Sequence, residues 1–221
     1  MSRVGLIRWG GLAAILGGVL WILFYTGHTF THGSTQSPRN ATILGLESLD
    51  FNRLLALPSL LFIIALFGAR ATRASTSRRL GRVAFVVALL GLVMIGLGVI
   101  LETWIIDPNK DFENPLVQGG WILFLFGLCP VLPIGMILYG IRSRDMERRL
   151  RILAVSIGVL APLQWFEMFL SSVSTGSVVW DLAYAVLRGL FGLGWIGLGY
   201  VLWSIEPEEQ SAASRQEAVA S

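Results

Sequence analysis

The sequence predicts an all-α membrane protein, a bundle of six transmembrane helices arranged as three tandem helical hairpins. Three observations predict it. The 221 residues are 54% hydrophobic and only 14% charged, whereas about a quarter of the residues in a soluble domain are charged. The apolar residues form long blocks, as a bilayer-spanning chain requires. Arginines cluster between alternate blocks, which is typical of the cytoplasmic loops of membrane proteins.

The first apolar block covers about residues 6–26 and follows Arg3 and Arg8. A cleaved signal peptide shares a basic start, but it has a shorter apolar region and ends in a small-x-small cleavage site. The segment 25–29, Tyr-Thr-Gly-His-Thr, offers no good match to such a site. We therefore expect a retained first transmembrane helix, followed by a polar loop to about Asp50.

Five further blocks follow, each close to the ~20 residues that a bilayer needs. They cover about 51–69, 83–106, 119–141, 152–172 and 179–205. Together with the first block they make one transmembrane domain, 1–205. The polar, acidic-leaning segment 206–221 is expected to be a disordered tail.

Arginine placement predicts the orientation of the chain. Twelve arginines lie at the N-terminus and in the loops after the second and fourth blocks, whereas the opposite loops and their edges hold only Arg39, Arg53 and Lys110. Positive residues stay on the cytoplasmic side, so both termini should be cytoplasmic. Lys110 is the only lysine, a bias that suggests a GC-rich bacterium and hence a bacterial plasma membrane.

The three hairpins are predicted from weak internal repetition. An arginine precedes a glycine by nine residues in each odd-numbered block, and a proline precedes a glycine by ten residues in two even-numbered blocks. The odd-numbered pairs are Arg8 with Gly17, Arg82 with Gly91 and Arg149 with Gly158; the even-numbered pairs are Pro58 with Gly68 and Pro130 with Gly140. Apolar sequence of low complexity also produces such matches by chance, so common ancestry of the hairpins stays open.

Prolines and small residues inside the blocks predict local features of the helices. Pro58, Pro130 and Pro162 indicate kinks, because proline cannot donate the backbone hydrogen bond of a helix interior. Small residues at helical spacing indicate close helix contacts. These residues are Gly10, Ala14 and Gly18 in the first block, and Ala185, Gly189 and Gly192 in the sixth.

Two charges inside apolar blocks mark the candidate functional site. Glu167 lies in the fifth block and Arg188 in the sixth, and intramembrane charges are costly, usually paired and often functional. At 1.5 Å per residue they lie roughly 7 Å and 5 Å outward of the midpoints of their helices. A bidentate pair between neighbouring helices is thus available. It would either fix helix packing or form part of a binding site.

Aromatic residues accompany both charges. Tyr184, Arg188, Phe191 and Trp195 follow helical spacing, and Trp165 precedes Glu167 by two residues. With Glu102 at the outer end of the third block, these side chains would wall a pocket for an anionic or amphipathic ligand. The alternative is that the aromatic residues only pack the bundle interior or line the membrane interface.

His28 and His32 are the only histidines and are one helical turn apart. Continued helix would place both on one face, as metal ligands often are, with Glu102 and either Glu47 or Asp50 completing a site. The alternative is a pair of solvated interfacial histidines. A bis-histidine haem is excluded, because it needs histidines on facing helices, and we predict no cofactor.

Three classes of function remain. The chain either binds or transports a small anionic or amphipathic ligand, or serves as a structural or accessory membrane subunit, or is an intramembrane enzyme using metal or carboxylates. No catalytic signature occurs, so no catalytic residue is assigned. The predicted partners are the bilayer, a small molecule and, for transport, a second copy of the chain. Nucleic acid is not expected, because the basic residues are dispersed in short clusters.

Overall fold

The computed structural model describes residues 2–32, 42–72, 79–105, 113–142, 146–171 and 178–205. Within these ranges the protein is an all-α bundle with no strand beyond an isolated bridge between Ile43 and Leu46. Five helices are long and apolar enough to cross a membrane. The predicted tail, 206–221, lies outside the described residues.

The described residues form six long helical stretches. The first is α1 (Arg3–His32); the second joins α2 (Ser48–Leu54) to α3 (Ala56–Ala71); the third is α4 (Arg79–Thr103). The fourth runs without interruption through α5 (Pro115–Phe126), the π-helical turn η1 (Gly127–Val131) and α6 (Leu132–Arg142). The last two are α7 (Arg148–Ser171) and α8 (Val178–Ser204).

The predicted blocks agree with these stretches to within about four residues at every limit except the end of the first. Helix α1 continues to His32, six residues beyond the predicted end at residue 26. No proline interrupts the segment, and Gly27 lets the ring of Phe51 on α2 approach closely: a Cβ at Gly27 would lie 2.5 Å from that ring. Part of the predicted polar loop is therefore helix.

Proline explains two of the irregularities. The break between α2 and α3 falls at Leu55, because Pro58 has no N–H to donate to the carbonyl of Leu54 and its ring crowds that carbonyl. In the fourth stretch Pro130 lies inside the π-helical turn, which accommodates the missing hydrogen bond. Helix α7 continues through Pro162, so this proline does not break the helix.

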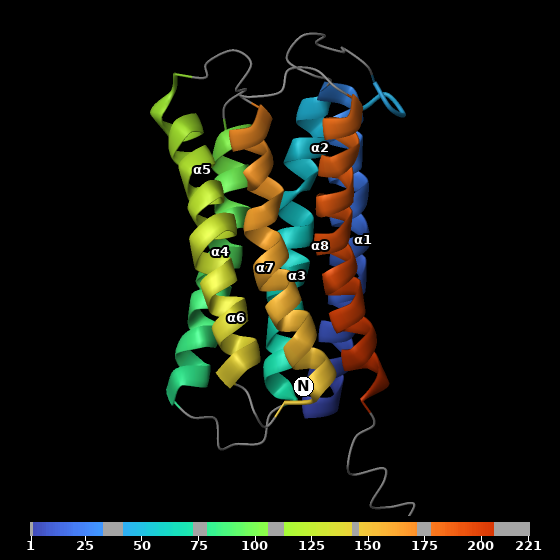
Figure 1. Ribbon diagram of the computed structural model, residues 1–221, viewed down its shortest axis with the longest axis vertical. Coiled ribbons are helices and arrows are strands. Elements are labelled where there is room, and N and C mark those ends of the chain that lie inside the picture. The colour runs from blue at the N-terminus through green and yellow to red at the C-terminus, as the bar shows by residue number, and fades with distance from the viewer. Residues whose placement is uncertain are drawn as a thin grey trace, which may run out of the picture.

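Each stretch packs against its neighbours in sequence, and the last returns to the first (Figure 1). Thus α1 contacts α3, α3 contacts α4, α4 contacts α5 and α6, α6 contacts α7, and α7 contacts α8, which closes on α1. Neighbouring stretches run in opposite directions (Figure 1). Helix α3 also contacts α8 across the ring, so the bundle centre is filled by side chains.

Backbone contact through glycine closes the ring between α1 and α8. A Cβ at Gly18 would lie 2.5 Å from the carbonyl oxygen of Gly192, so neither position tolerates a side chain without movement. The spacing of small residues predicts a close helix contact at each of these two glycines but does not identify them as partners. Gly10 also makes the close contact predicted for it, with Gly68 on α3, whose Cα lies 2.5 Å from the Cβ position of Gly10. Gly189, in contrast, has no atom within 4 Å of its Cβ position, so the contact predicted there is absent.

The predicted repeat is only partly reflected in the packing. Gly17 faces Phe62 and Gly91 faces Leu132, each within its own hairpin. In the third hairpin, however, Gly158 faces Ile137 and the carbonyl of Pro133 on α6, the preceding helix. Equivalent sequence positions therefore do not make equivalent contacts throughout.

The surface of the bundle is apolar along the helices, and one of its two ends is rich in arginine. Large apolar side chains are half exposed along the helices, among them Val86 (55%), Leu97 (49%), Ile134 (52%) and Val186 (52%). The ends of α3 and α6 and the starts of α1, α4 and α7 carry most of the arginines and lie at one end (Figure 1). Exposed Trp9 and Trp203 lie near this end, and exposed Trp104 lies at the other. This pattern fits membrane integration.

Candidate functional site

A column of buried aromatic rings fills the space between α1, α3 and α8. It consists of Trp21, Tyr25, Phe62, Phe191 and Trp195, all at most 6% exposed. Phe62 and Trp195 stack at 4.2 Å between ring centroids with an interplanar angle of 12°. The predicted stripe of Phe191 and Trp195 thus faces inward, but its partners from α1 and α3 were not predicted.

Trp21 contacts three other rings of this aromatic column. Its ring centroid lies 5.9 Å from that of Phe62, 5.1 Å from that of Phe191 and 4.7 Å from that of Tyr25. Contacts of this kind are each worth about 0.5–1.5 kcal/mol beyond the burial of their area. The column therefore holds three helices together.

Arg188 lies at the outer end of the aromatic column. The Cζ atom of its guanidinium is 4.5 Å from the centroid of the Tyr25 ring, a cation–π geometry worth about 0.5–2 kcal/mol depending on desolvation. The arginine is half-buried. The predicted intramembrane cation is therefore in contact with an aromatic face inside the bundle, one helical turn from Phe191.

Gln164 on α7 adds an amide to the same region. It is buried, at 4% exposure, and its Oε1 accepts a hydrogen bond of 3.3 Å from Nε1 of Trp21. Its Nε2 and the Nε1 of Trp195 have no hydrogen-bond partner among the described residues. Both are donors, and a buried donor without a partner costs about 1–3 kcal/mol. An additional acceptor in this region would therefore satisfy a donor that the described residues leave unpaired.

The side chains of Glu167, Trp165 and Tyr184 lie outside the described residues, so pairing of Glu167 with Arg188 stays a prediction. The backbone of α7 nevertheless bears on it. Residue 167 lies about 4.5 Å beyond Gln164 along α7, and Arg188 lies about as far outward of Phe191 along α8. Since Gln164 and Phe191 both contact Trp21, the two charged positions lie at similar depth.

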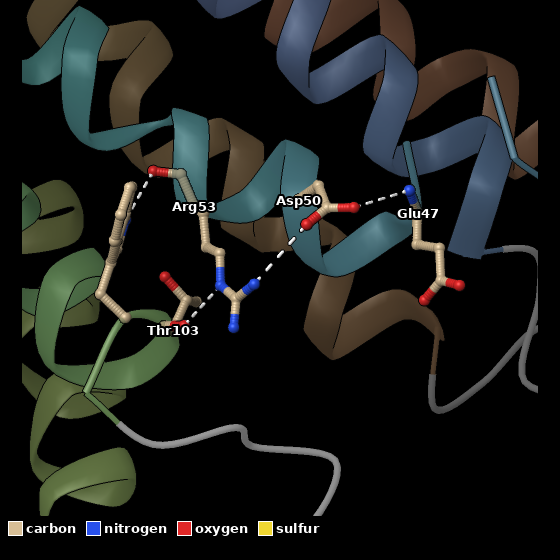
Figure 2. Close-up of polar contacts among 5 residues, drawn as sticks. Glu47, Asp50, Arg53 and Thr103 are labelled. Atoms are coloured by element: carbon tan, nitrogen blue, oxygen red, sulfur yellow. Dashed lines mark hydrogen bonds and ion pairs between the residues drawn. The ribbon is translucent and has the colours of Figure 1, made fainter. Parts of the chain in front are cut away.

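Glu102 lies near the end of α4 and is half-buried. The neighbouring residues form a polar network with α2 (Figure 2). Arg53 Nε donates to the carbonyl of Thr103 at 2.8 Å, and Trp104 Nε1 donates to the carbonyl of Arg53 at 3.1 Å. This network ties α2 to the end of α4; it does not bring Glu102 to Arg188.

Asp50, proposed as a metal ligand, has two other partners in this network (Figure 2). Its Oδ2 accepts from the backbone N–H of Glu47 at 3.1 Å, which caps the start of α2. Its Oδ1 lies 3.6 Å from Nη1 of Arg53. The carboxylate is thus engaged by a helix start and a guanidinium.

Arginine Nε atoms donate to the carbonyls at the ends of neighbouring helices in three places. Besides Arg53, Arg3 donates to the carbonyl of Ala71 at 2.7 Å, and Arg151 donates to that of Gly140 at 3.1 Å. Carbonyls in the last turn of a helix have no partner within it, and the negative end of the helix dipole favours a cation. These arginines therefore cap helices to which they do not belong.

The predicted metal site involves His28 and His32. Both belong to α1, so the helix does continue through them, one turn apart. The side chain of His32 lies outside the described residues. In the part of the chain that the structure describes, no three His, Cys, Asp or Glu side chains are grouped to hold a metal ion. The site stays a prediction without support from the geometry.

No protein family, curated protein or solved structure matches this chain.

The main omissions of the sequence prediction are Gln164, Trp21, Tyr25 and Phe62. Trp21 and Tyr25 are one helical turn apart, so a search for aromatic pairs in every block would have found a stripe facing that of α8. Gln164 is an amide inside an apolar block, so it stands out in the sequence for the same reason as Glu167: a polar side chain among apolar residues. Phe62 has no distinguishing signal in the sequence.

Proposed function

We propose that this protein binds a small anionic or amphipathic ligand beside Arg188, at the outer end of the aromatic column. The observation that carries the proposal is the guanidinium of Arg188 over the Tyr25 ring, inside a bundle whose surface is apolar. Two buried polar atoms of the same column region have no hydrogen-bond partner among the described residues, Nε2 of Gln164 and, two helical turns inward of Arg188, Nε1 of Trp195, and both are donors. A site that offers donors and a cation recognises an acceptor or an anion.

The proposal includes six crossings of a bacterial plasma membrane with both termini cytoplasmic. In addition to the five apolar helices, α7 has 24 residues, which at 1.5 Å per residue exceeds the ~30 Å hydrocarbon core. The concentration of arginines at one end supports the orientation. A reporter that is active only in the cytoplasm should be active when fused after residues 75, 145 or 221. A reporter that is active only in the periplasm should be inactive at the same three positions, and a signal from it would contradict the topology.

Ligand binding is tested with octanoate, an anionic probe, and 1-octanol, a neutral probe with the same chain length. Trp21 and Trp195 belong to the column, so intrinsic fluorescence of the purified protein in nonionic detergent provides the readout. Arg188→Gln should weaken octanoate binding about 10- to 150-fold, the value of a charge-assisted hydrogen bond. Octanol binding should change little.

Arg8→Gln is the matched control, because it removes the same charge from an exposed position near the other end of the bundle. Octanoate binding that falls equally in both variants would reflect overall charge. Equal binding of octanoate and octanol would indicate partition into the detergent or the apolar surface. Either result would contradict the proposal.

A structural role is the second candidate, favoured by the close packing of the aromatic column. If Glu167 and Arg188 only fix packing, Glu167→Gln and Arg188→Leu should each destabilise the protein, and the double variant should recover much of the loss. Additive losses would exclude the pair. A double variant that is stable but no longer binds octanoate would favour the ligand site.

A further inference from the structure

A groove lies on the bundle surface between α6 and α7, at the arginine-rich end and away from the aromatic column. Its volume is about 410 Å³, within the usual range of ligand pockets. Its residues come from the last turn of α6 and the first turns of α7: Gly140, Ile141, Arg148, Arg151, Ile152, Val155 and Ser156. Ile141 and Ile152 are half exposed, so the groove opens on the apolar side of the bundle.

The polarity of the groove changes along its length. Arg148 and Arg151 lie in the first turn of α7, at the end of the bundle, whereas Val155 lies a turn further toward its middle. A phospholipid has the same order, an anionic phosphate followed by an apolar chain. Basic pockets between transmembrane helices are known sites for such headgroups.

One of the two arginines is held in position. Arg151 is half-buried, and its Nε donates to the carbonyl of Gly140 at 3.1 Å. A guanidinium has further N–H groups in a rigid planar fork, which suits bidentate contact with a phosphate. Gly140 also allows close approach of the two helices: a Cβ there would lie 2.7 Å from the carbonyl oxygen of Arg151.

From these observations we infer that the groove binds an anionic phospholipid, with the phosphate at Arg148 and Arg151 and an acyl chain along Ile152 and Val155. The polarity gradient and the position at the end of the apolar surface distinguish this occupant from a soluble anion, which would gain nothing from the apolar wall. The inference depends on membrane integration and is independent of the ligand proposed at Arg188.

Arg149 offers a matched control on the same helical turn. It does not line the groove, and its Nε lies 3.9 Å from Oε1 of Glu147. Arg148→Gln and Arg149→Gln therefore remove the same charge one residue apart, and only the former changes the groove. Val155→Phe tests the other half of the site, because it fills the groove without altering charge.

The experiment is native mass spectrometry of the full-length protein in nonionic detergent, titrated with phosphatidylglycerol or phosphatidylcholine. Arg148→Gln should weaken phosphatidylglycerol binding about five-fold, as expected for one arginine at an anionic surface. Val155→Phe should also weaken it, and Arg149→Gln should leave it within two-fold of the wild type. Soluble glycerol phosphate should not compete.

Four outcomes would overturn the inference. They are equal binding of the two lipids, an equal effect of Arg148→Gln and Arg149→Gln, unchanged binding in Val155→Phe, and competition by glycerol phosphate, which would indicate a site for a free anion. Melting temperature and size-exclusion profile are recorded for each variant. Arg148→Gln is preferred to a change at Arg151, whose hydrogen bond to Gly140 also supports the fold.

Discussion

Gly119 and Gly120 on α5 are adjacent glycines with opposite surroundings, and they test the packing of α4 against α5. A Cβ at Gly120 would lie 2.6 Å from the backbone nitrogen of Glu102 and 2.8 Å from the carbonyl oxygen of Gly98. A Cβ at Gly119 would meet nothing within 4 Å. The perturbation is the same single methyl group, introduced as Gly119→Ala or Gly120→Ala.

The expected magnitudes follow from two terms. Replacing glycine by alanine in a helix interior gains about 0.8–1 kcal/mol from propensity, and this gain is common to both variants. Overpacking costs about 1–3 kcal/mol, and it applies only to Gly120. The atoms met there belong to the α4 backbone and cannot rotate away, so the two helices must separate. The free energies of unfolding of the two variants should thus differ by about 1–3 kcal/mol.

The assay is thermal unfolding of the purified variants in one detergent, followed by tryptophan fluorescence. Gly119→Ala should melt at or above the wild-type temperature. Gly120→Ala should melt roughly 2–12 °C below Gly119→Ala, at about 2–4 °C per kcal/mol. Equal melting temperatures would refute the close backbone contact. A lower melting temperature for Gly119→Ala alone would show that the helix is rotated relative to the structure.

Three further predictions follow from single contacts. Arg53→Gln should lower the free energy of unfolding by about 1–3 kcal/mol, because the carbonyl of Thr103 loses its charged donor; denaturant titration measures it, and an unchanged midpoint would contradict the cap. Trp21→Phe should cost about 1–3 kcal/mol by leaving the buried Oε1 of Gln164 without its donor, and Trp21→Phe combined with Gln164→Leu should be more stable than Trp21→Phe alone. Pro58→Ala should protect the break between α2 and α3 from hydrogen exchange; unchanged exchange there would assign the break to another cause.

The positions of the helices were predictable because a bilayer imposes a strong pattern on the sequence. A helix that spans a bilayer needs about 20 apolar residues, and the limits predicted from this length lie within four residues of the ends of α7 and α8. The end of α1 was missed because polar residues can continue a helix once it leaves the hydrocarbon region. Composition therefore marks the membrane boundary and not the end of the helix.

Contacts between helices were predictable only where the backbone itself takes part. Gly18 and Gly192 each make the close contact that their spacing predicts, although the spacing does not identify them as partners, and Gly189, one turn away, faces open space. Two crossing helices remain in close contact over a short length, and spacing alone does not locate the crossing point. The bond between Trp21 and Gln164 joins residues that are 143 positions apart, a separation over which local pattern carries no information.

The location of the aromatic column has a physical reason that connects packing with the candidate site. Between lipid-embedded helices, apolar contact gains little over contact with lipid tails, so specific association depends on close backbone approach and polar contacts. Closure of the ring joins α1 to α8, the helices most distant in sequence, and no short loop holds them together. The Gly18–Gly192 contact, the bond of Trp21 to Gln164 and the stacking of Arg188 on Tyr25 all lie at or beside this closure. A ligand that binds Arg188 would therefore act on the contact between α1 and α8 that completes the bundle. Its binding should stabilise this contact more than the contact between any other pair of helices.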